Sequence, residues 1–382
     1  MDRTLYLSTI ALLFFSIVSV YSLSVFTTIH FDASPYTFVK KQLVAVIISI
    51  IVMTILSKLD INKFNAIGFS LFILSFIAII VMMLLPEAYA KTTLGARRWI
   101  KFAHISIAPT EFFKYGFVFF VSWSLARKSK DFKYVNTLGS EIKQAMPYFM
   151  LLIVSVAFIA IGQKDLGQVV VLSAVLMGLF FISNRSKKFF SAIFLLFIFL
   201  VVLLIKYAPH RIDRFKGWWV YIQNSIPFLP DSFKVSDRTI PLNVINSTGA
   251  IENGGILGRG LGAGQYKLGF LSEVHTDFVL AGISEEIGFI GLALVVGLFT
   301  FIIYRIFKIA ASLDNLAHKY FAYGVGMTLF LSFIINAFGI SGLIPIKGIA
   351  VPLLSYGGSQ ILATSIAIGM VLMLSKGVKK WV

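Results

Sequence analysis

The chain has 382 residues, of which 58% are hydrophobic and only 13% are charged, and its basic residues give a formal net charge of +17. This composition excludes a soluble globular protein and indicates a polytopic membrane protein. The chain has no cysteine, which excludes disulfides, thiolate catalysis and cysteine-ligated metals. The basic residues cluster between apolar runs, where the positive-inside rule places them, so the charge does not indicate nucleic-acid binding.

Apolar runs of spanning length predict ten transmembrane helices. The first run is too long for a signal peptide and lacks a small-residue cleavage site, so we interpret it as a retained helix. We therefore expect an all-α polytopic membrane protein that forms a single transmembrane domain over residues 1–382. The ten runs lie at about 5–26, 42–57, 65–85, 110–126, 146–162, 168–183, 189–207, 278–304, 320–340 and 354–375.

The distribution of basic residues predicts the orientation of these helices. With the N-terminus inside, the short inner connections carry 17 lysines and arginines and the short outer connections carry 8. This bias predicts that both termini are cytoplasmic. The outer residues Arg97, Arg98, Lys101 and Lys347 are exceptions to the rule, and the cluster at 97–101 suits binding of a lipid phosphate.

One connection, between the seventh and eighth helices, is far longer than the others. Residues 209–276 form a 68-residue segment that we expect outside the membrane, and connections this long are uncommon unless they are functional. Its first part, RIDRFKGWWVYIQ, mixes basic and aromatic residues and is typical of the headgroup region. Its second part contains GRGLGAG, which lacks the strand and spacing of a nucleotide loop and instead favours a hinge or a close backbone approach to a ligand.

The stretch after this connection, SEVHTDFVLAGISEEIGFIG, places three acids at or inside an apolar helix. Acids within a membrane are costly and usually face the bundle interior or a wet cavity. Asp277, beside His275 at the membrane boundary, is well placed to accept a proton, and capping of the following helix is the alternative. Glu285 and Glu286 follow within the apolar run itself.

Three further segments carry polar residues where apolar ones would be expected. In APTEFFKYG, Glu111 and Lys114 share a helix face at i, i+3, either as a structural ion pair or as the wall of a substrate cavity. In GQKDLGQ, Asp165 is predicted to cap the helix that follows. The prolines and paired glycines of IPIKGIAVPLLSYGGSQ predict a re-entrant or broken segment, with Lys347 and Ser355 facing a cavity.

Five motifs together carry a resemblance to a known family. GARRWI, APTEFFK, GRGLGAGQYKLG, HTDFVLAGISEEIGFIG and PIKGIAVPLLSYGGSQ occur in this order between about residues 90 and 365. The chain thereby resembles the SEDS (shape, elongation, division, sporulation) family of peptidoglycan polymerases. The double arginine at 97–98 and Lys347-Gly348 are more similar to its division branch, FtsW, than to its elongation branch, RodA. The chain departs from the usual motifs at Ala108, Lys164, Ser272 and Gln360.

The resemblance implies a ten-helix fold and a function. That function is polymerisation of lipid II into glycan strands at the outer face of the bacterial cytoplasmic membrane, for septal wall synthesis in cell division. It also implies a class B penicillin-binding protein as transpeptidase partner, together with other division proteins. Asp277 matches the family's essential aspartate, and Glu111 and Lys114 match its conserved pair. A RodA-type role in elongation and cell shape is the near alternative.

Lipid II polymerisation requires a sugar hydroxyl to displace undecaprenyl pyrophosphate, with inversion at the anomeric carbon. A positioned general base accelerates such an attack, and we assign that role to Asp277. The leaving pyrophosphate needs cations, which basic side chains or a divalent Mg²⁺ or Mn²⁺ would supply, and Asp277 is then also a candidate metal ligand. The residues expected to bind substrate are Glu111, Lys114, Arg98, Arg259, Lys267, His275, Lys347 and Ser355.

Two functions of other classes remain as alternatives. Broken helices and intramembrane charges also occur in transporters, so a lipid II flippase is one. The sequence shows no inverted repeat, and its most prominent acid lies at one membrane face instead of the midplane. A non-catalytic division scaffold is the other, and it would leave the polar residues unexplained.

Overall fold

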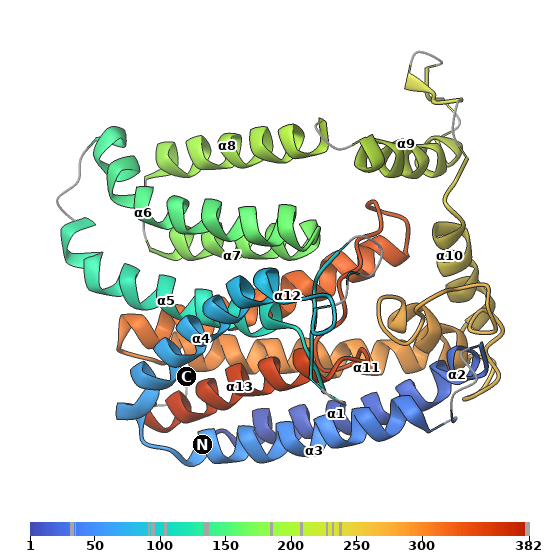
Figure 1. Cartoon of the computed structure of the whole chain (residues 1–382), viewed down its shortest axis with the longest axis horizontal. Coiled ribbons are helices and arrows are strands. Elements are labelled where there is room, and N and C mark those ends of the chain that lie inside the picture. Colours follow the sequence, from blue (N-terminus) through green and yellow to red (C-terminus); the bar gives the residue numbers. More distant parts are fainter. Residues whose placement is uncertain are drawn as a thin grey trace.

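Helices make up nearly all the regular structure of the computed structural model (Figure 1). The described residues are 1–30, 34, 36–90, 92, 96–102, 105–132, 137–183, 186–206, 209–226, 228–230, 233–236 and 239–378. The α-helices are α1 (Arg3–Leu23), α2 (Val25–His30), α3 (Thr37–Lys58), α4 (Phe64–Leu84), α5 (Pro109–Phe132), α6 (Leu138–Val156), α7 (Leu166–Ile182), α8 (Lys187–Lys206), α9 (Pro209–Asn224), α10 (Leu242–Gly254), α11 (Val279–Ala311), α12 (Leu316–Ile340) and α13 (Gly358–Leu374).

The expected membrane fold is confirmed. Each of the ten predicted apolar runs coincides with a helix, namely α1, α3 to α8 and α11 to α13. Within the described residues, seven helical stretches are long and apolar enough to cross a membrane, and α7 is apolar but shorter. A turn of π-helix, Ala157–Gly162, extends α6 to the tight turn before α7. The short strands β1 (Ile100–Phe102) and β2 (Ile105–Ile107) pair antiparallel just before α5.

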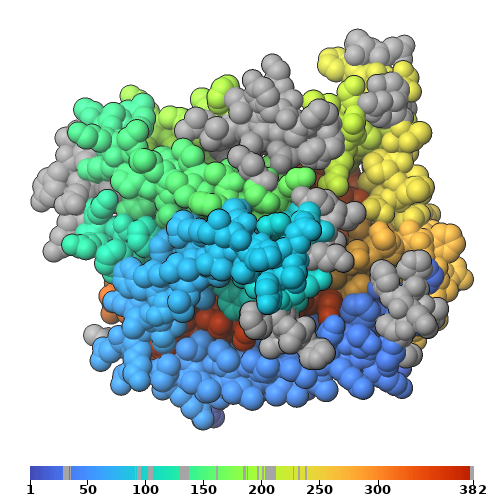
Figure 2. Space-filling view, viewed as in Figure 1, coloured from blue at the N-terminus to red at the C-terminus, as the bar shows by residue number. Residues whose placement is uncertain are grey.

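Helix α13 is the centre of the bundle. Its buried residues lie on all sides of the helix, and it packs against α3 and α5. A helix that is apolar all round belongs in the interior. On the face drawn in Figure 2, only narrow strips of this red segment show between the blue and cyan helices. Helix α12 packs against α5, α7 and α11, and α1 packs against α11.

The two termini lie side by side at one end of the bundle, on the left in Figure 1. The backbone N–H of Asp2 donates to Ser375 Oγ over 2.9 Å, and the Asp2 carboxylate pairs with Arg305 over 2.5 Å. Asp2 also caps α1 by accepting the N–H of Leu5. The opposite end of the bundle therefore holds the beginning of α11, which is 33 residues long and spans about 50 Å at 1.5 Å per residue.

The long connection before α11 contains two helices that the sequence pattern did not predict, α9 and α10. Helix α9 holds the aromatic residues, and the indole N–H of Trp218 donates to Gly342 O over 2.7 Å, which ties α9 to the end of α12. The glycine-rich part packs against the backbone of α11: a Cβ at Gly258 would lie 2.3 Å from Glu286 O. Gly258 therefore approaches the backbone of a helix of the same chain closely, and an approach of the glycine-rich part to a ligand stays a prediction.

Candidate active site

Asp277 lies in a turn immediately before α11, at the end of the bundle opposite the termini. Helix α11 begins at Val279 after the N-cap residue Phe278, and within the described residues no side-chain hydrogen bond caps it. The capping alternative for Asp277 is therefore wrong in this structure. Its carboxylate is half-buried and available for another role.

The backbone around Asp277 is held by the broken segment that precedes α13. The Asn336 side-chain amide donates to Asp277 O over 2.6 Å and to Ile349 O over 2.7 Å, so one side chain joins the two segments. A Cβ placed on Gly348 would lie 2.6 Å from Asp277 Oδ2. A larger residue at position 348 would displace this carboxylate, so glycine lets the backbone of residues 347–349 approach it without moving it.

Burial and neighbouring charges set the acidity of Asp277. Burial, together with the carboxylates of Glu273 and Asp165 and against the opposing effect of the Arg98 guanidinium, raises the pKa of Asp277 to about 7. Within a folded protein, a carboxylate that titrates near neutral pH marks a candidate functional site. It also matches what general-base catalysis requires, because the base must be ionised and still basic at the working pH.

Asp165 caps α7, as predicted, by accepting the N–H of Gln168 over 3.2 Å. Asp165 has a second effect, because its negative charge raises the pKa of Asp277. The pKa of Asp165 is itself raised by burial and lowered by the Arg98 guanidinium. The sequence interpretation left Asp165 out of the site. Its position in a tight turn, at the same predicted membrane boundary as Asp277, could have indicated that the two carboxylates lie near each other.

Glu111 and Lys114, in the first turns of α5, form the ion pair that their spacing predicts. Lys114 Nζ lies 2.8 Å from Glu111 Oε2, and the two side chains are 3% and 16% exposed. The Gln168 amide donates to Glu111 Oε1 over 2.9 Å and so links the pair to α7. The charges of both residues act on Asp165. The pair thus belongs to the same electrostatic cluster as Asp277, and its role in substrate binding stays a prediction.

Arg98 stabilises the turn that presents Asp165. Its guanidinium donates to Gln163 O over 3.2 Å and to Lys164 O over 3.1 Å. Arg97 points elsewhere, donating to the carbonyls that end α4 and lying 3.8 Å from Glu87. The two arginines therefore make separate contacts, and of the two only Arg98 lowers the pKa of Asp277.

Two basic residues predicted to bind the substrate make their contacts outside this electrostatic cluster. Lys267 is 3% exposed and its ammonium pairs with Glu286 over 2.6 Å, so its charge is matched inside the protein. Arg259 is exposed, and its guanidinium donates to the backbone and side-chain oxygens of Asn253. Lys267 is therefore engaged within the protein, and the binding of pyrophosphate by Lys267 or Arg259 stays a prediction.

Three further residues predicted to bind substrate flank Asp277 in different ways, namely His275, Ser355 and Lys347. His275 packs edge-on against Phe38 with ring centroids 4.8 Å apart, and burial lowers its pKa. Ser355 is fully buried, donates to Thr276 O over 2.6 Å and accepts the N–H of Val351. It therefore holds the Asp277 turn in place and does not face a cavity. Lys347 is half-buried and directly precedes Gly348.

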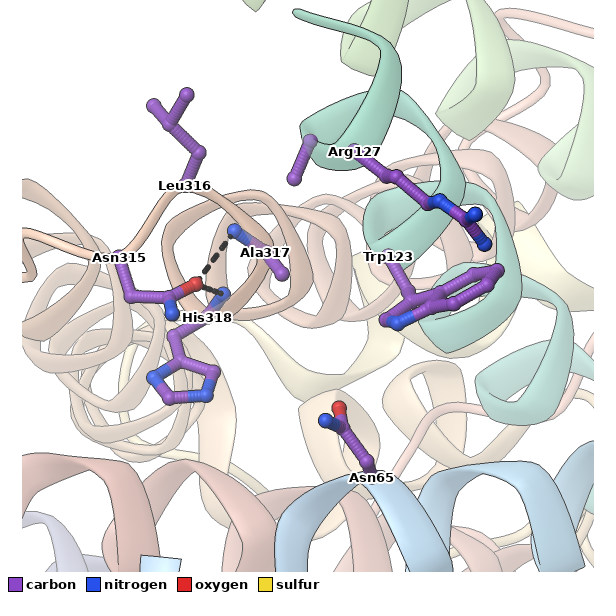
Figure 3. Close-up of a pocket in the computed structure, with 8 residues that line it drawn as sticks. Asn65, Trp123, Arg127, Asn315, Leu316, Ala317 and His318 are labelled. Atoms are coloured by element: carbon purple, nitrogen blue, oxygen red, sulfur yellow. Dashed lines mark hydrogen bonds between the residues drawn. The ribbon is translucent and has the colours of Figure 1, made fainter. Parts of the chain in front are cut away.

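Two cavities differ in character. An apolar groove of about 750 Å³ runs along α4, between α3 and α5, and ends at Ile107, Pro109 and Phe112 beside the first turn of α5. A polar pocket of about 470 Å³ lies at the α12 N-terminus, where Asn315 caps the helix and Arg127 lies 5.6 Å from the Trp123 ring centroid (Figure 3). The predicted site residues do not line this second pocket.

A metal site is not preformed in the part of the chain that the structure describes. Among those residues, no three histidine, aspartate or glutamate side chains are grouped so that they could hold a metal ion. The proposed role of Asp277 as a metal ligand stays an untested prediction.

These features define a polytopic membrane protein whose candidate catalytic carboxylate lies at one end of the helix bundle. The family model described as "Cell cycle protein", that of FtsW, RodA and SpoVE, matches residues 3–380. The chain belongs to this family, the SEDS family that its motifs resemble.

Curated relatives agree with this membership over nearly the whole chain. The chain is 42% identical to the "Probable peptidoglycan glycosyltransferase FtsW" of Helicobacter pylori (strain 26695), with 99% of both chains covered. It is 30% identical to the protein of the same name from Haemophilus influenzae, with 97% of this chain and 89% of that one covered.

Two solved structures share the fold at 20% identity, each covering 99% of this chain and 98% of the other. One is Thermus thermophilus RodA, with a TM-score of 0.67. The other is a chain from "Structural coordination of polymerization and crosslinking by a peptidoglycan synthase complex", with a TM-score of 0.74.

Proposed function

We propose that this chain is a peptidoglycan glycosyltransferase that polymerises lipid II, with Asp277 as the general base. The observation that carries the assignment is the half-buried Asp277 carboxylate, whose pKa of about 7 suits proton transfer. Membership of the FtsW, RodA and SpoVE family and the name of the 42%-identical relative support the reaction.

In the proposed reaction, the 4-hydroxyl of the acceptor sugar attacks the anomeric carbon of the donor. The new bond joins that oxygen to the anomeric carbon, and the bond to the pyrophosphate oxygen breaks. Asp277 takes the hydroxyl proton, and undecaprenyl pyrophosphate leaves with the bonding electrons. Direct displacement inverts the anomeric configuration.

Arg98, Lys114 and Lys347 are the proposed cations for the leaving group. Arg98 acts electrostatically on Asp277, Lys114 acts on the neighbouring Asp165, and Lys347 lies next to the glycine that touches the Asp277 carboxylate. Fixed positive charge stabilises a developing pyrophosphate most strongly where water is excluded.

The apolar groove along α4 suits the polyprenyl chain of the substrate. It is lined almost entirely by aliphatic and aromatic side chains. One end of the groove lies at Pro109 and Phe112, which stand on either side of Glu111 in the sequence. A lipid tail in this groove would therefore bring its pyrophosphate to the first turn of α5, beside the charged cluster.

The cellular setting follows from the same proposal. We place the enzyme in the bacterial cytoplasmic membrane, with both termini cytoplasmic and residues 209–276 outside, as the 17-to-8 charge distribution favours. The names of the relatives support a septal role in division, alongside a class B penicillin-binding protein and other division proteins. The complex described for the structural neighbour joins polymerisation to crosslinking, which supports a partner of this kind.

Glycan synthesis from lipid II by the purified protein in detergent tests the proposal. Detergent micelles have no two sides, so a flippase or a scaffold would produce no glycan there. Polymer formation that requires Asp277 would support the assignment, and its absence with the transpeptidase partner present would contradict it. An elongation enzyme would pass the same test, so complementation of division and elongation mutants separates those two roles.

A further inference from the structure

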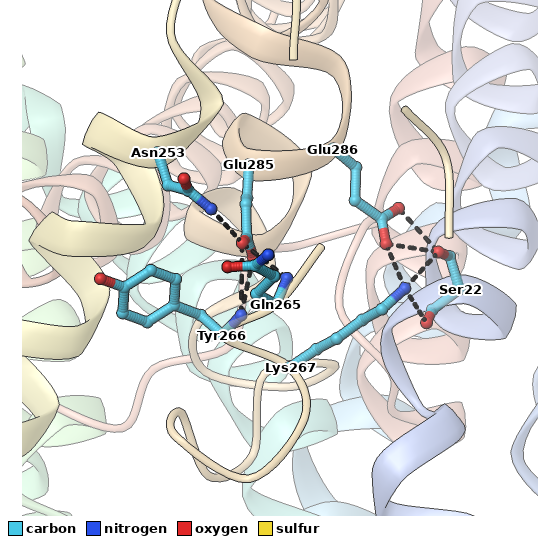
Figure 4. A network of polar contacts seen from close by, with 7 residues as sticks. All are labelled: Ser22, Asn253, Gln265, Tyr266, Lys267, Glu285 and Glu286. Atoms are coloured by element: carbon cyan, nitrogen blue, oxygen red, sulfur yellow. Dashed lines mark hydrogen bonds and ion pairs between the residues drawn. The ribbon is translucent and has the colours of Figure 1, made fainter. Parts of the chain in front are cut away.

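Two buried carboxylates have no part in the proposed chemistry. Glu285 and Glu286 lie in α11 and are 1% and 3% exposed. A buried charge is costly unless it is paired and hydrogen-bonded, and acids in membrane helices generally mark a function. Both carboxylates contact residues 265–267, in the segment that leads to Asp277, and each also contacts a residue from another helix (Figure 4).

Glu285 binds the backbone at the start of that segment. Its Oε1 accepts the N–H of Gln265 over 2.7 Å, and its two oxygens share the N–H of Tyr266 at 3.2 Å. The Asn253 amide at the end of α10 donates to the same Oε1 over 2.8 Å. One carboxylate therefore connects α10, residues 265–266 and α11.

Glu286 extends the connection to the first helix. Lys267 Nζ pairs with Glu286 Oε1 over 2.6 Å and also donates to Ser22 O over 3.1 Å. Ser22 Oγ in turn donates to the carboxylate of Glu286 over 2.6 Å. The start of the segment is thereby fixed to α1 as well as to α11.

The backbone of α11 is broken where these contacts are made. Gly288 has φ +68° and ψ −173°, which interrupts the helical hydrogen bonds. Residues 255–260 supply the missing partners. The N–H groups of Arg259 and Gly260 donate to the carbonyls of Glu285 and Glu286, and those of residues 289 and 290 donate to the carbonyls of residues 255 and 256.

These contacts close residues 265–285 into a loop, hereafter the clasped loop. Both of its ends meet at the Glu285 carboxylate, and Asp277 lies within it. At its far side the loop is held by Asn336, which donates to Asp277 O. We propose that Glu285 is a positioning residue for the reaction, and that Glu286 and Lys267 assist it by holding the clasped loop so that Asp277 meets the substrate in a fixed geometry. This inference rests on the proposed function.

Steady-state kinetics of Glu285→Ala and Glu285→Gln test the proposal. Glu285→Ala removes the acceptor of all three donors, whereas Glu285→Gln keeps one acceptor oxygen and the shape of the side chain. A misplacement of about 1 Å lowers a rate by about 10²-fold, so we expect kcat to fall 10- to 100-fold in Glu285→Ala, with a smaller loss in Glu285→Gln. KM should change little, because the substrate-binding residues proposed above are untouched.

The matched control is Glu252→Gln, which removes an exposed carboxylate from α10 in the same part of the chain. Its kcat should equal that of the wild type. If Glu285→Ala fails to fold, Glu285→Gln decides. Wild-type kcat in folded Glu285→Gln and Glu285→Ala proteins would overturn the proposal.

The pH dependence of kcat separates positioning from general stability. The charged groups that face Asp277 are Glu273 in the clasped loop, Asp165 from the turn before α7 and Arg98 from the segment before β1. An opened loop admits water to Asp277, so the acidic midpoint of the profile should move to lower pH in Glu285→Ala. A role in stability alone would lower the amount of active enzyme at every pH and leave the midpoint unchanged.

A second readout needs no activity. Because the chain has no cysteine, Asp277→Cys introduces a single thiol. Its rate of modification by a polar maleimide, in purified protein, should rise at least about tenfold when Glu285→Ala is added, since local opening controls access to protected sites. Equal rates with and without Glu285→Ala would overturn the proposal, whereas a wild-type protein that makes no glycan would overturn the proposed function and leave this result standing.

Discussion

At the residue scale, the account depends on the acidity of Asp277. Burial and the charges of Glu273 and Asp165 raise its pKa to about 7. The ionised form is the base, so the polymerisation rate should fall as the pH decreases through about 7. In Glu273→Gln one repelling charge is removed, the pKa of Asp277 falls, and the midpoint of the pH profile of kcat should move to lower pH. An unchanged midpoint would mean that another group controls the profile.

The same raised pKa predicts an effect on stability. Between the ordinary pKa of an aspartate and about 7, the folded protein holds a proton on Asp277 that the unfolded chain has lost, so this group destabilises the fold progressively as the pH rises through that range. Asp277→Asn removes the titration. The melting temperature of the variant, relative to the wild type, should therefore be higher at pH 8 than at pH 5. An equal difference at both pH values would contradict the assigned pKa.

At the element scale, the segment before α13 must approach the Asp277 turn closely. In Gly348→Ala the added Cβ would lie 2.6 Å from Asp277 Oδ2 and displace the carboxylate. We expect kcat to fall by about tenfold or more in a folded protein, since misplacement of a reacting group is costly. Gly297→Ala on α11 is the control, because its Cβ would meet no atom within 4 Å. Equal activity of the two variants would show that the approach of Gly348 is unimportant.

The ion pair at the start of α5 yields a separate prediction. Glu111→Gln leaves the Lys114 charge, which is 3% exposed, without its 2.8 Å partner, and removal of one partner of a buried pair costs about 3–5 kcal/mol. Thermal unfolding should show a lower melting temperature for Glu111→Gln, and adding Lys114→Met should recover part of the loss. Purely additive effects on the melting temperature would show that the two residues are not coupled.

The sequence predicted local relations at this scale and missed long-range ones. Ten apolar runs mark the membrane helices, and an i, i+3 spacing was enough to pair Glu111 with Lys114. The contact of Lys267 with Glu286 and Ser22 was not predictable, because Ser22 lies 264 residues from Glu286 and only packing brings α1 to α11. Helices α9 and α10 were missed because their polar and glycine-containing sequences show no apolar run of spanning length.

At the scale of the whole molecule, the position of Asp277 depends on the orientation of the bundle. The termini meet at one end, and Asp277 lies at the other, beyond the 33 residues of α11. A single cysteine at exposed Ser225, in the 209–276 segment, should react with an impermeant maleimide in intact spheroplasts. A single cysteine at exposed Asp314 should react only after lysis. The reverse pattern would place Asp277 on the cytoplasmic side.

The electrostatic cluster is also a property of the whole molecule. Arg98, Glu111, Asp165 and Asp277 come from four separate segments, and no spacing in the sequence relates them. The sequence could therefore identify Asp277 and the α5 pair as candidates, whereas their assembly around the turn before α7 required the packed bundle. Burial in the packed bundle, reinforced by the charges of Glu273 and Asp165, raises the pKa of this carboxylate at the membrane boundary to about 7.

The central claim is that Asp277 accepts the proton of the attacking hydroxyl. The most direct test is lipid II polymerisation by purified Asp277→Asn protein, with the partner transpeptidase present and blocked by penicillin, across a range of Mg²⁺ and Mn²⁺ concentrations. The variant keeps the shape of the side chain and loses the proton acceptor, so the rate should fall by at least about 10²-fold at every metal concentration. Near-normal glycan synthesis by the folded variant would contradict the account, and recovery at high metal concentration would replace the general base with a metal ligand.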